Sequence, residues 1–146
     1  MKLQLSTQIN CPPRQVFSWI DDPEKAKLWQ KGVKKTEILK ETPEKTGTTF
    51  REEIEENGKR LIIFGEITRY VPNKLIAFLL DSKIHTVKAT FSVSGSEHLT
   101  TFSANWQIKW KFPMSLMAGL FHKRIKSNIL EQSKSEFSEL KRLCEI

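Results

Sequence analysis

Residues 101–111, TFSANWQIKWK, decide the fold, because every second side chain in this stretch is apolar. The side chains between them are polar or charged. Successive side chains of a β-strand point to opposite faces of a sheet, so this alternation predicts a strand with one buried face. The apolar face carries Phe102, Ala104, Trp106, Ile108 and Trp110. A sheet with one apolar face needs another element to cover it.

Residues 32–100 predict further strands, separated by the turn signals Asn57-Gly58, Pro72-Asn73, Ser82-Lys83 and Ser96-Glu97. Pairing around these turns sets Ile54 opposite Leu61, Phe50 opposite Gly65, Ile67 opposite Phe78, Phe78 opposite Val87, Leu80 opposite His85, Phe91 opposite Phe102, and Val87 opposite Trp106. All four turns place the apolar residues on the same face, although a one-residue slip would turn a strand over. This agreement predicts a six-stranded antiparallel meander with a single buried side.

The two ends of the chain predict the remaining elements. Residues 2–9 alternate in the same way and predict a strand that pairs with residues 101–111. Asn10 with Pro12-Pro13, and then Asp22-Pro23, predict the starts of two short helices. Residues 113–144 have apolar side chains at helical spacing, which predicts one long amphipathic helix. The predicted fold is α+β: a curved seven-stranded antiparallel sheet, two short helices after the first strand, and a long C-terminal helix over the concave face.

Size and charge limit the class of protein. A chain of 146 residues and 17.0 kDa is expected to form a single domain, 1–146. Cys11 and Cys144 have neither metal-binding nor redox-motif spacing, which favours two reduced thiols. The sequence shows no signal peptide and no apolar run of bilayer length, so we expect a cytoplasmic protein without stable membrane insertion. The formal charge of +7 comes from scattered Lys and Arg, and even the densest basic group, residues 122–126, predicts a solvated helix face rather than a nucleic-acid site.

Several short motifs resemble those of one protein superfamily. They are PRQVFSWI at 13–20, Asp22-Pro23, Trp29, Gly47, EITRYVPNKL at 66–75, Leu99-Thr100 and LKRL at 140–143. In this order the chain resembles, end to end, the START-like superfamily (also called SRPBCC), which includes polyketide cyclase/dehydrase-like and birch-pollen-allergen-like proteins. One departure is HLTT at 98–101, where members often have Gly-Thr before the last strand. The resemblance implies the helix-grip fold with a hydrophobic cavity between sheet and helix. Members bind lipids, plant hormones, polyketides or quinones in this cavity, and some catalyse cyclisation or dehydration there.

Candidate catalytic residues come from the register, because the sequence contains no recognisable catalytic motif. The three histidines lie in different predicted elements without metal-binding spacing, so neither a metal nor another cofactor is expected. Three ionisable side chains, His85, Glu52 and Arg69, are predicted on the apolar face. His85 would act as a general acid/base or a hydrogen-bond anchor, or else lie at the rim and bond to water. Arg69 would pair with an acidic ligand or with Glu52, or extend to solvent.

The apolar face also predicts the lining of a ligand cavity. The candidate ligand-binding residues are Phe50, Ile54, Phe78, His85, Val87, Phe91, Trp106, Ile108, Trp110, Met117 and Phe121. The alternative is that these side chains fill a packed core. A strongly curved sheet over one helix is hard to fill, and small residues lie among the large ones: Gly65, Ala89 and Ala104. On the last helix, a polar ridge either borders the cavity or faces solvent; it consists of Asn128, Gln132 and Glu136.

Three functions remain open from the sequence. The first is the binding or carrying of a small hydrophobic ligand such as a lipid, and the second is a cavity enzyme of the polyketide cyclase/dehydratase or isomerase type. The third is a protein-interaction module, because outward-facing apolar residues would form a patch on the convex face. These residues are Ile62, Phe64, Tyr70, Leu75, Ala77 and Leu79. A homodimer would use Ile62, Phe64 and Leu79.

Overall fold

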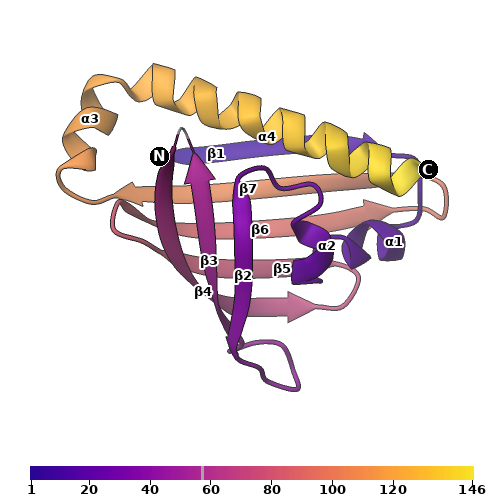
Figure 1. Cartoon of the computed structure of the whole chain (residues 1–146). Helices are drawn as coiled ribbons and strands as arrows, with labels where there is room; N and C mark the ends of the chain where they lie inside the picture. Colours follow the sequence, from indigo (N-terminus) through magenta and orange to yellow (C-terminus); the bar gives the residue numbers. More distant parts are fainter. Residues whose placement is uncertain (57) are drawn as a thin grey trace.

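Seven strands form one antiparallel sheet in the computed structural model, which describes residues 1–56 and 58–146 (Figure 1). The strands are β1 (Lys2–Ile9), β2 (Val33–Lys40), β3 (Thr49–Glu56), β4 (Lys59–Val71), β5 (Leu75–Asp81), β6 (His85–Gly95) and β7 (Thr100–Trp110). Their order across the sheet is β1-β7-β6-β5-β4-β3-β2. Strands β2 to β7 therefore form the predicted meander, and β1 pairs with β7 as predicted. The predicted β3–β4 turn includes Asn57, which lies outside the described residues.

The register of the first two predicted hairpins is confirmed. Ile54 lies opposite Leu61 and Phe50 opposite Gly65 in the β3–β4 pair. In the β4–β5 pair, the predicted partners are also opposite each other: Ile67 and Phe78.

The predicted partners in the β5–β6 and β6–β7 hairpins were wrong by two residues. The observed pairs are Phe78 with Ala89, Leu80 with Val87, Phe91 with Ala104 and Val87 with Ile108. Each turn begins one residue later than predicted, because the N–H of Ser82 donates to the carbonyl of His85 and the N–H of Ser96 to that of Leu99. A displacement of two residues leaves every side chain on its predicted face, so the predicted inside of these strands is unchanged.

A β-bulge in β4 contradicts one part of the predicted inward face. Ile67 pairs with Phe78 but Arg69 pairs with Ala77, so Thr68 is an additional residue on this strand. Beyond the bulge the two faces are exchanged. Arg69, predicted to point inward, is exposed, whereas the side chain of the following tyrosine, predicted to point outward, packs against the core.

Two short helices follow β1 as predicted: α1 (Pro13–Ser18) and α2 (Pro23–Ala26). The Asp22 carboxylate accepts the N–H of Glu24 and caps α2. The cap position of α1 is Pro12, without a side-chain hydrogen bond, so the predicted cap by Asn10 was wrong.

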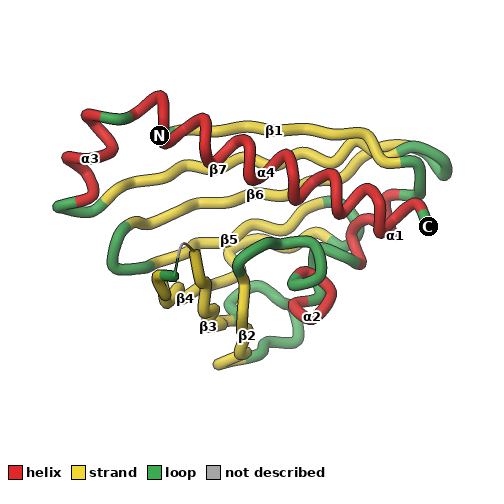
Figure 2. The backbone as a smooth tube through the Cα atoms, turned by 45° about the horizontal axis from the view of Figure 1, so that its top comes forward, coloured by secondary structure: helices red, strands yellow, loops and turns green. Residues whose placement is uncertain are grey.

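The single C-terminal helix that the spacing predicts is divided in two. α3 (Met114–Leu120) and α4 (His122–Glu145) are separated at Phe121, whose φ of −118° and ψ of 35° are not helical. α4 lies along β1 and covers the sheet (Figure 2), whereas α3 lies beyond the strand ends, at the end of the molecule opposite α1 and α2. Among the described residues, no helix combines the length and the apolarity that a bilayer crossing requires.

The core fills the end of the sheet nearest α1. Phe17, Phe102 and Leu140 are among its fully buried side chains. Cys11 and Cys144 are buried in the same core as free thiols, and their side chains contact each other. Burial raises the pKa of both thiols, that of Cys144 to about 12. The beginning of the chain and the end of α4 are therefore packed together.

Candidate functional site

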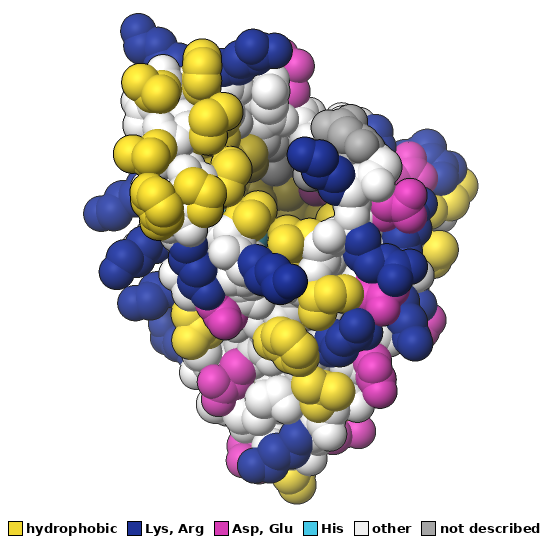
Figure 3. Space-filling model, turned by 60° about the vertical axis from the view of Figure 1, so that its left-hand side comes forward, with side chains coloured by type: hydrophobic (Ala, Val, Ile, Leu, Met, Phe, Trp, Pro, Cys, Tyr) yellow, Lys and Arg dark blue, Asp and Glu magenta, His cyan; other side chains and the backbone are white. Residues whose placement is uncertain are grey.

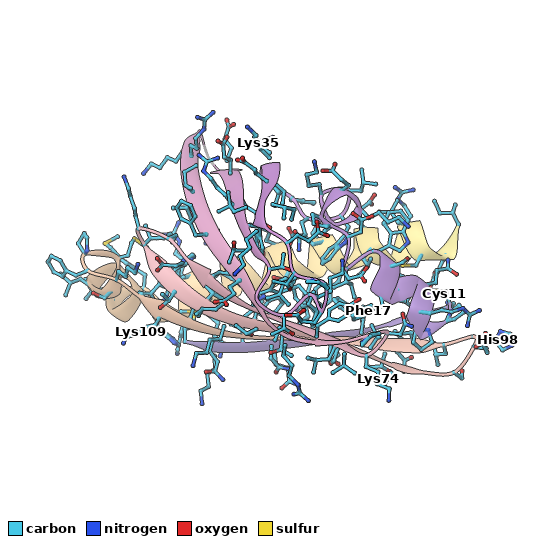
Figure 4. All side chains as sticks on the ribbon, turned by 90° about the horizontal axis from the view of Figure 1, so that it is seen from below. Cys11, Phe17, Lys35, Lys74, His98 and Lys109 are labelled. Carbon is cyan, nitrogen blue, oxygen red and sulfur yellow. The ribbon has the colours of Figure 1, made fainter. Side chains whose placement is uncertain are left out.

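A cavity of about 470 Å³ lies between the concave face of the sheet and α4, and its wall is mostly apolar. Its wall includes the predicted Phe50, Ile54, Phe78, His85, Val87, Phe91, Trp106, Ile108 and Trp110. Two predicted residues, Met117 and Phe121, do not border it, because the break after α3 leaves them exposed to solvent. Figure 4 shows side chains of the sheet and α4 entering the space between them, while the labelled Lys74 and His98 point away.

The small residues of the inner face contribute to the cavity in different ways. A Cβ on Gly65 would lie 2.2 Å from Cζ of Phe50, so glycine allows the aromatic ring to lie directly on the β4 backbone. Ala89 borders the cavity between Phe78 and the β7 strand. Ala104 is fully buried in the core and is not part of the wall. Of these small residues, only Ala89 leaves room for a ligand.

Polar groups of the wall lie along one row across the sheet. Glu52 on β3 is opposite Ile63 on β4, and His85 on β6 is opposite Trp110 on β7. Ser82, directly after β5, bonds to His85 across the intervening turn. Neighbouring strands in this row are about 4.8 Å apart. We call Glu52, Ser82, His85 and Trp110 the polar row; it crosses the α3 end of the sheet, and all but Ser82 border the cavity.

Glu52 faces the cavity, and burial raises the pKa of its carboxyl group from 4.5 to about 7. No side chain in the described part of the chain forms a hydrogen bond or ion pair with it. Near neutral pH the carboxyl group therefore exists in both forms. The protonated form donates a hydrogen bond and the ionised form only accepts.

The hydrogen bonds of Ser82 determine which nitrogen of His85 carries the proton. The Ser82 Oγ accepts the backbone N–H groups of Ile84 and His85, at 3.3 and 3.2 Å. With both lone pairs engaged, the hydroxyl group has two acceptors for its own proton: His85 Nδ1 at 2.9 Å and the His85 carbonyl oxygen at 3.2 Å. When the hydroxyl group donates to the nearer acceptor, Nδ1, the neutral ring carries its proton on Nε2. Burial, the largest cause, lowers the pKa of His85, which favours this neutral form.

Trp110 supplies a further N–H group to the polar row. Its Nε1 atom is buried and has no hydrogen-bond partner among residues 1–56 and 58–146. Its ring lies against that of His85, with 5.2 Å between the ring centroids. A buried N–H without a partner is unfavourable, and an oxygen atom of a ligand or of water would satisfy it. The polar row thus contains an unpaired N–H donor beside an apolar cavity.

Further polar groups of the wall include Tyr70, which sequence reasoning missed, and two residues of the α4 ridge, for which it left both alternatives open. Tyr70, turned inward by the bulge, donates to Asp21 at 2.9 Å; burial and this bond raise the pKa of Tyr70 to about 12. From the polar ridge of α4, Gln132 and Glu136 border the cavity and Asn128 is exposed. The spacing of this ridge was visible in the sequence, whereas no sequence signal marks the bulge.

The convex face retains a smaller apolar patch than predicted. Phe64 and Leu79 are exposed on adjacent strands, and Ile62 is partly buried. Tyr70 has left this face because of the bulge. The candidate catalytic residue Arg69 also lies outside the cavity.

Comparison with known proteins shows the family of the chain. The profile of the family described as "Polyketide cyclase / dehydrase and lipid transport" matches residues 1–145. None of the curated proteins matches the chain in sequence.

Solved structures share the fold over almost the whole chain. TTHA0849 from Thermus thermophilus has a TM-score of 0.79 and 17% identity, covering 99% of this chain and 97% of its own. The Zhui aromatase/cyclase from Streptomyces sp. R1128 has a TM-score of 0.81 and 12% identity, with 99% and 93% covered. A START superfamily protein from Mycobacterium smegmatis has a TM-score of 0.79 and 16% identity, with 97% and 98% covered. At these identities the likeness to solved structures shows the helix-grip fold alone. The family is shown by the profile, which matches residues 1–145. The chain therefore belongs to the polyketide cyclase/dehydrase and lipid transport family.

Proposed function

We propose that this protein binds and carries a small, largely apolar ligand that has at least one oxygen acceptor. The observation that carries this proposal is an apolar cavity of about 470 Å³ whose wall includes His85 and Trp110, together with the buried Trp110 N–H that has no partner in the described part of the chain. Ligand sites usually measure about 300–1,000 Å³ and combine an apolar wall with a few polar groups that orient the ligand. The family description, which names polyketide cyclases and lipid transport, accords with ligands of this kind.

The ligand would be oriented by its oxygen. The His85 Nε2–H and the Trp110 Nε1–H belong to neighbouring strands, and their rings are in contact. A carbonyl, hydroxyl or ether oxygen would accept from them, while rings or alkyl chains pack on Phe78 and Trp106. The gain comes mainly from satisfying a donor that is otherwise unpaired in a desolvated site.

A pair of shape-matched probes tests this proposal. Fluorene and fluorenone have the same three-ring shape, and only fluorenone has a carbonyl oxygen. Both should quench tryptophan fluorescence saturably, because Trp29, Trp106 and Trp110 border the cavity. Fluorenone should bind roughly 3- to 10-fold more tightly, the worth of one hydrogen bond.

Variants locate the site of binding. His85→Ala and Trp110→Phe should reduce the preference for fluorenone, whereas His98→Ala, at an exposed histidine outside the cavity, should not. Ala89→Leu should weaken both probes by filling the wall between Phe78 and Trp106. Absence of saturable quenching would overturn the binding proposal, and equal affinity for the two probes would overturn the role of the polar row.

A cavity enzyme is the second candidate, and one observation favours it. A Glu52 pKa of about 7 suits a general acid or base at neutral pH. Catalysis also requires two such groups near one reacting atom, yet Glu52 and His85 are on strands separated by two others. Native mass spectrometry of protein from its own host should reveal a retained molecule. Conversion of that molecule by the wild type but not by Glu52→Gln would establish the enzyme instead of the carrier.

A further inference from the structure

The segment around α3 exposes a group of large apolar side chains. Its members are Phe112, Leu116, Met117, Leu120 and Phe121, and we call them the α3 patch. Phe112 is 76% exposed and Leu120 is 77% exposed. Only Ala118 of α3 is buried, so this helix makes little use of its apolar residues in packing. Contiguous apolar surfaces of this kind mark contacts with partners or membranes.

Basic side chains border the α3 patch, and acidic ones are absent from the surrounding sequence. Residues 98–130 contain no Asp or Glu. They contain Lys109, Lys111, Lys123, Arg124 and Lys126. Of these, Lys111 is paired with Asp81, whereas the other four form no ion pair in the described part of the chain. Figure 3 shows hydrophobic side chains gathered over α3 with Lys and Arg along their margin.

The α3 patch lies beside one end of the cavity. Trp110, in the cavity wall, is followed directly by the segment that leads into α3. Figure 3 shows the surface hollowed between the apolar group over α3 and the β3–β4 hairpin. A ligand that enters or leaves near the polar row would therefore pass the α3 patch.

We infer that the α3 patch docks on the surface of an anionic lipid bilayer and places the adjacent end of the cavity against it. The seven residues of α3 form a helix about 10 Å long, which suits shallow burial at the headgroup boundary. Lysines and arginines beside an apolar helix attract anionic lipid headgroups. This inference deepens the proposed function, because it names a membrane as the source of the ligand. The source of the ligand depends on the proposed function, whereas the docking of the α3 patch does not.

A second copy of this chain fits the patch less well. Self-association through the α3 patch would bring two basic margins together with no acidic residue from 98–130 to neutralise them. Like charges placed together in an interface disfavour the complex. A bilayer containing anionic lipid accepts the apolar side chains and neutralises the bordering charges at the same time.

Vesicle flotation tests the inference on the full chain. One set of vesicles is pure phosphatidylcholine, and the other is an equimolar mixture with phosphatidylglycerol. The protein should float with the mixed vesicles and much less with the pure ones, and added salt should weaken its binding. Leu120→Asp should abolish flotation, whereas Leu28→Asp, at a similarly exposed leucine after α2, should leave it unchanged. Lys123→Glu should weaken the apparent affinity at least roughly fivefold, and Lys74→Glu, in the exposed β4–β5 turn, should not.

Three results would overturn the inference. No flotation with mixed vesicles, or equal loss in a variant and its control, would exclude docking through α3. A dimer in analytical ultracentrifugation that Leu120→Asp converts to a monomer would assign the patch to a second copy of the chain. Fluorenone binding without vesicles separates the two proposals, because Leu120→Asp should retain it. Vesicle binding without fluorenone binding would leave docking intact and refute the proposed ligand site.

Discussion

The ionisation of Glu52 should make the stability of the fold depend on pH in a direction that most carboxyl groups do not produce. Because the pKa of Glu52 is raised from 4.5 to about 7 by burial, the folded protein holds this proton more tightly than the unfolded chain. Below pH 4.5 both states are protonated and the group has no effect. As pH rises from 4.5 to 7, the unfolded chain ionises first, so the contribution of Glu52 to the free energy of unfolding falls.

The size of the effect follows from the two pKa values. A rise from 4.5 to about 7 corresponds to roughly 3 kcal/mol of destabilisation above pH 7, at 1.36 kcal/mol per pKa unit. Glu52→Gln keeps the shape of the side chain and removes the charge. The variant should therefore be more stable than the wild type by up to roughly 3 kcal/mol at pH 8, with almost no difference at pH 4.5.

Urea denaturation of both proteins at a series of pH values measures this difference directly. The wild-type and variant chains share every other titratable group, so the pH dependence of their difference isolates Glu52. Glu55→Gln, at an exposed carboxylate on the same strand, is the matched control and should show no such dependence. A Glu52→Gln difference that stays constant from pH 4.5 to 8 would refute the claim that Glu52 is desolvated in the cavity.

Three further substitutions test the packing around the site. Gly65→Ala should lower the free energy of unfolding by roughly 1–3 kcal/mol in urea denaturation, because the new Cβ would displace the Phe50 ring. Tyr70→Phe should lower it by about 1 kcal/mol through loss of the bond to Asp21, and an unchanged value would refute a stabilising role for that bond. If the convex patch forms a homodimer, Phe64→Glu should yield a folded monomer in light scattering; a wild type that is monomeric at high concentration would rule out the dimer.

The inner face of the sheet was predictable because the alternation of apolar and polar residues assigns side chains to the correct face even when a turn is misplaced by one residue. The predicted turns after β5 and β6 were each displaced by one residue, which moved the strand partners by two. Phe78 and Phe91 consequently kept their faces, although Phe78 was assigned the wrong partner on β6 and Phe91 the wrong partner on β7. Alternation fixes the face of a side chain, and turn chemistry fixes only its neighbour.

The errors occurred where distant contacts determine local geometry. The inward turn of Tyr70 accompanies a bond to Asp21, 49 residues earlier in the chain, which local alternation does not reveal. Similarly, the apolar spacing runs on through Met117 and Phe121, so it predicts one continuous helix. The sheet ends at Trp110, however, and provides no surface beside α3 for these side chains. Part of the polar row was predictable, because the alternation placed His85 and Glu52 on the apolar face. That the Trp110 N–H has no partner among the described residues could be found only from the three-dimensional structure.

The pairing of the first strand with the last also constrains how the chain is made. Ser6 and Ser103, which bond across β1 and β7, are separated by 97 positions. On a ribosome that adds about 5–20 residues per second, the β1 segment would wait roughly 5–20 seconds for its partner. Its other neighbour, α4, is synthesised later still. The meander from β2 to β6 can assemble during this interval, so β1, which emerges before these strands, is among the last elements to acquire its native contacts.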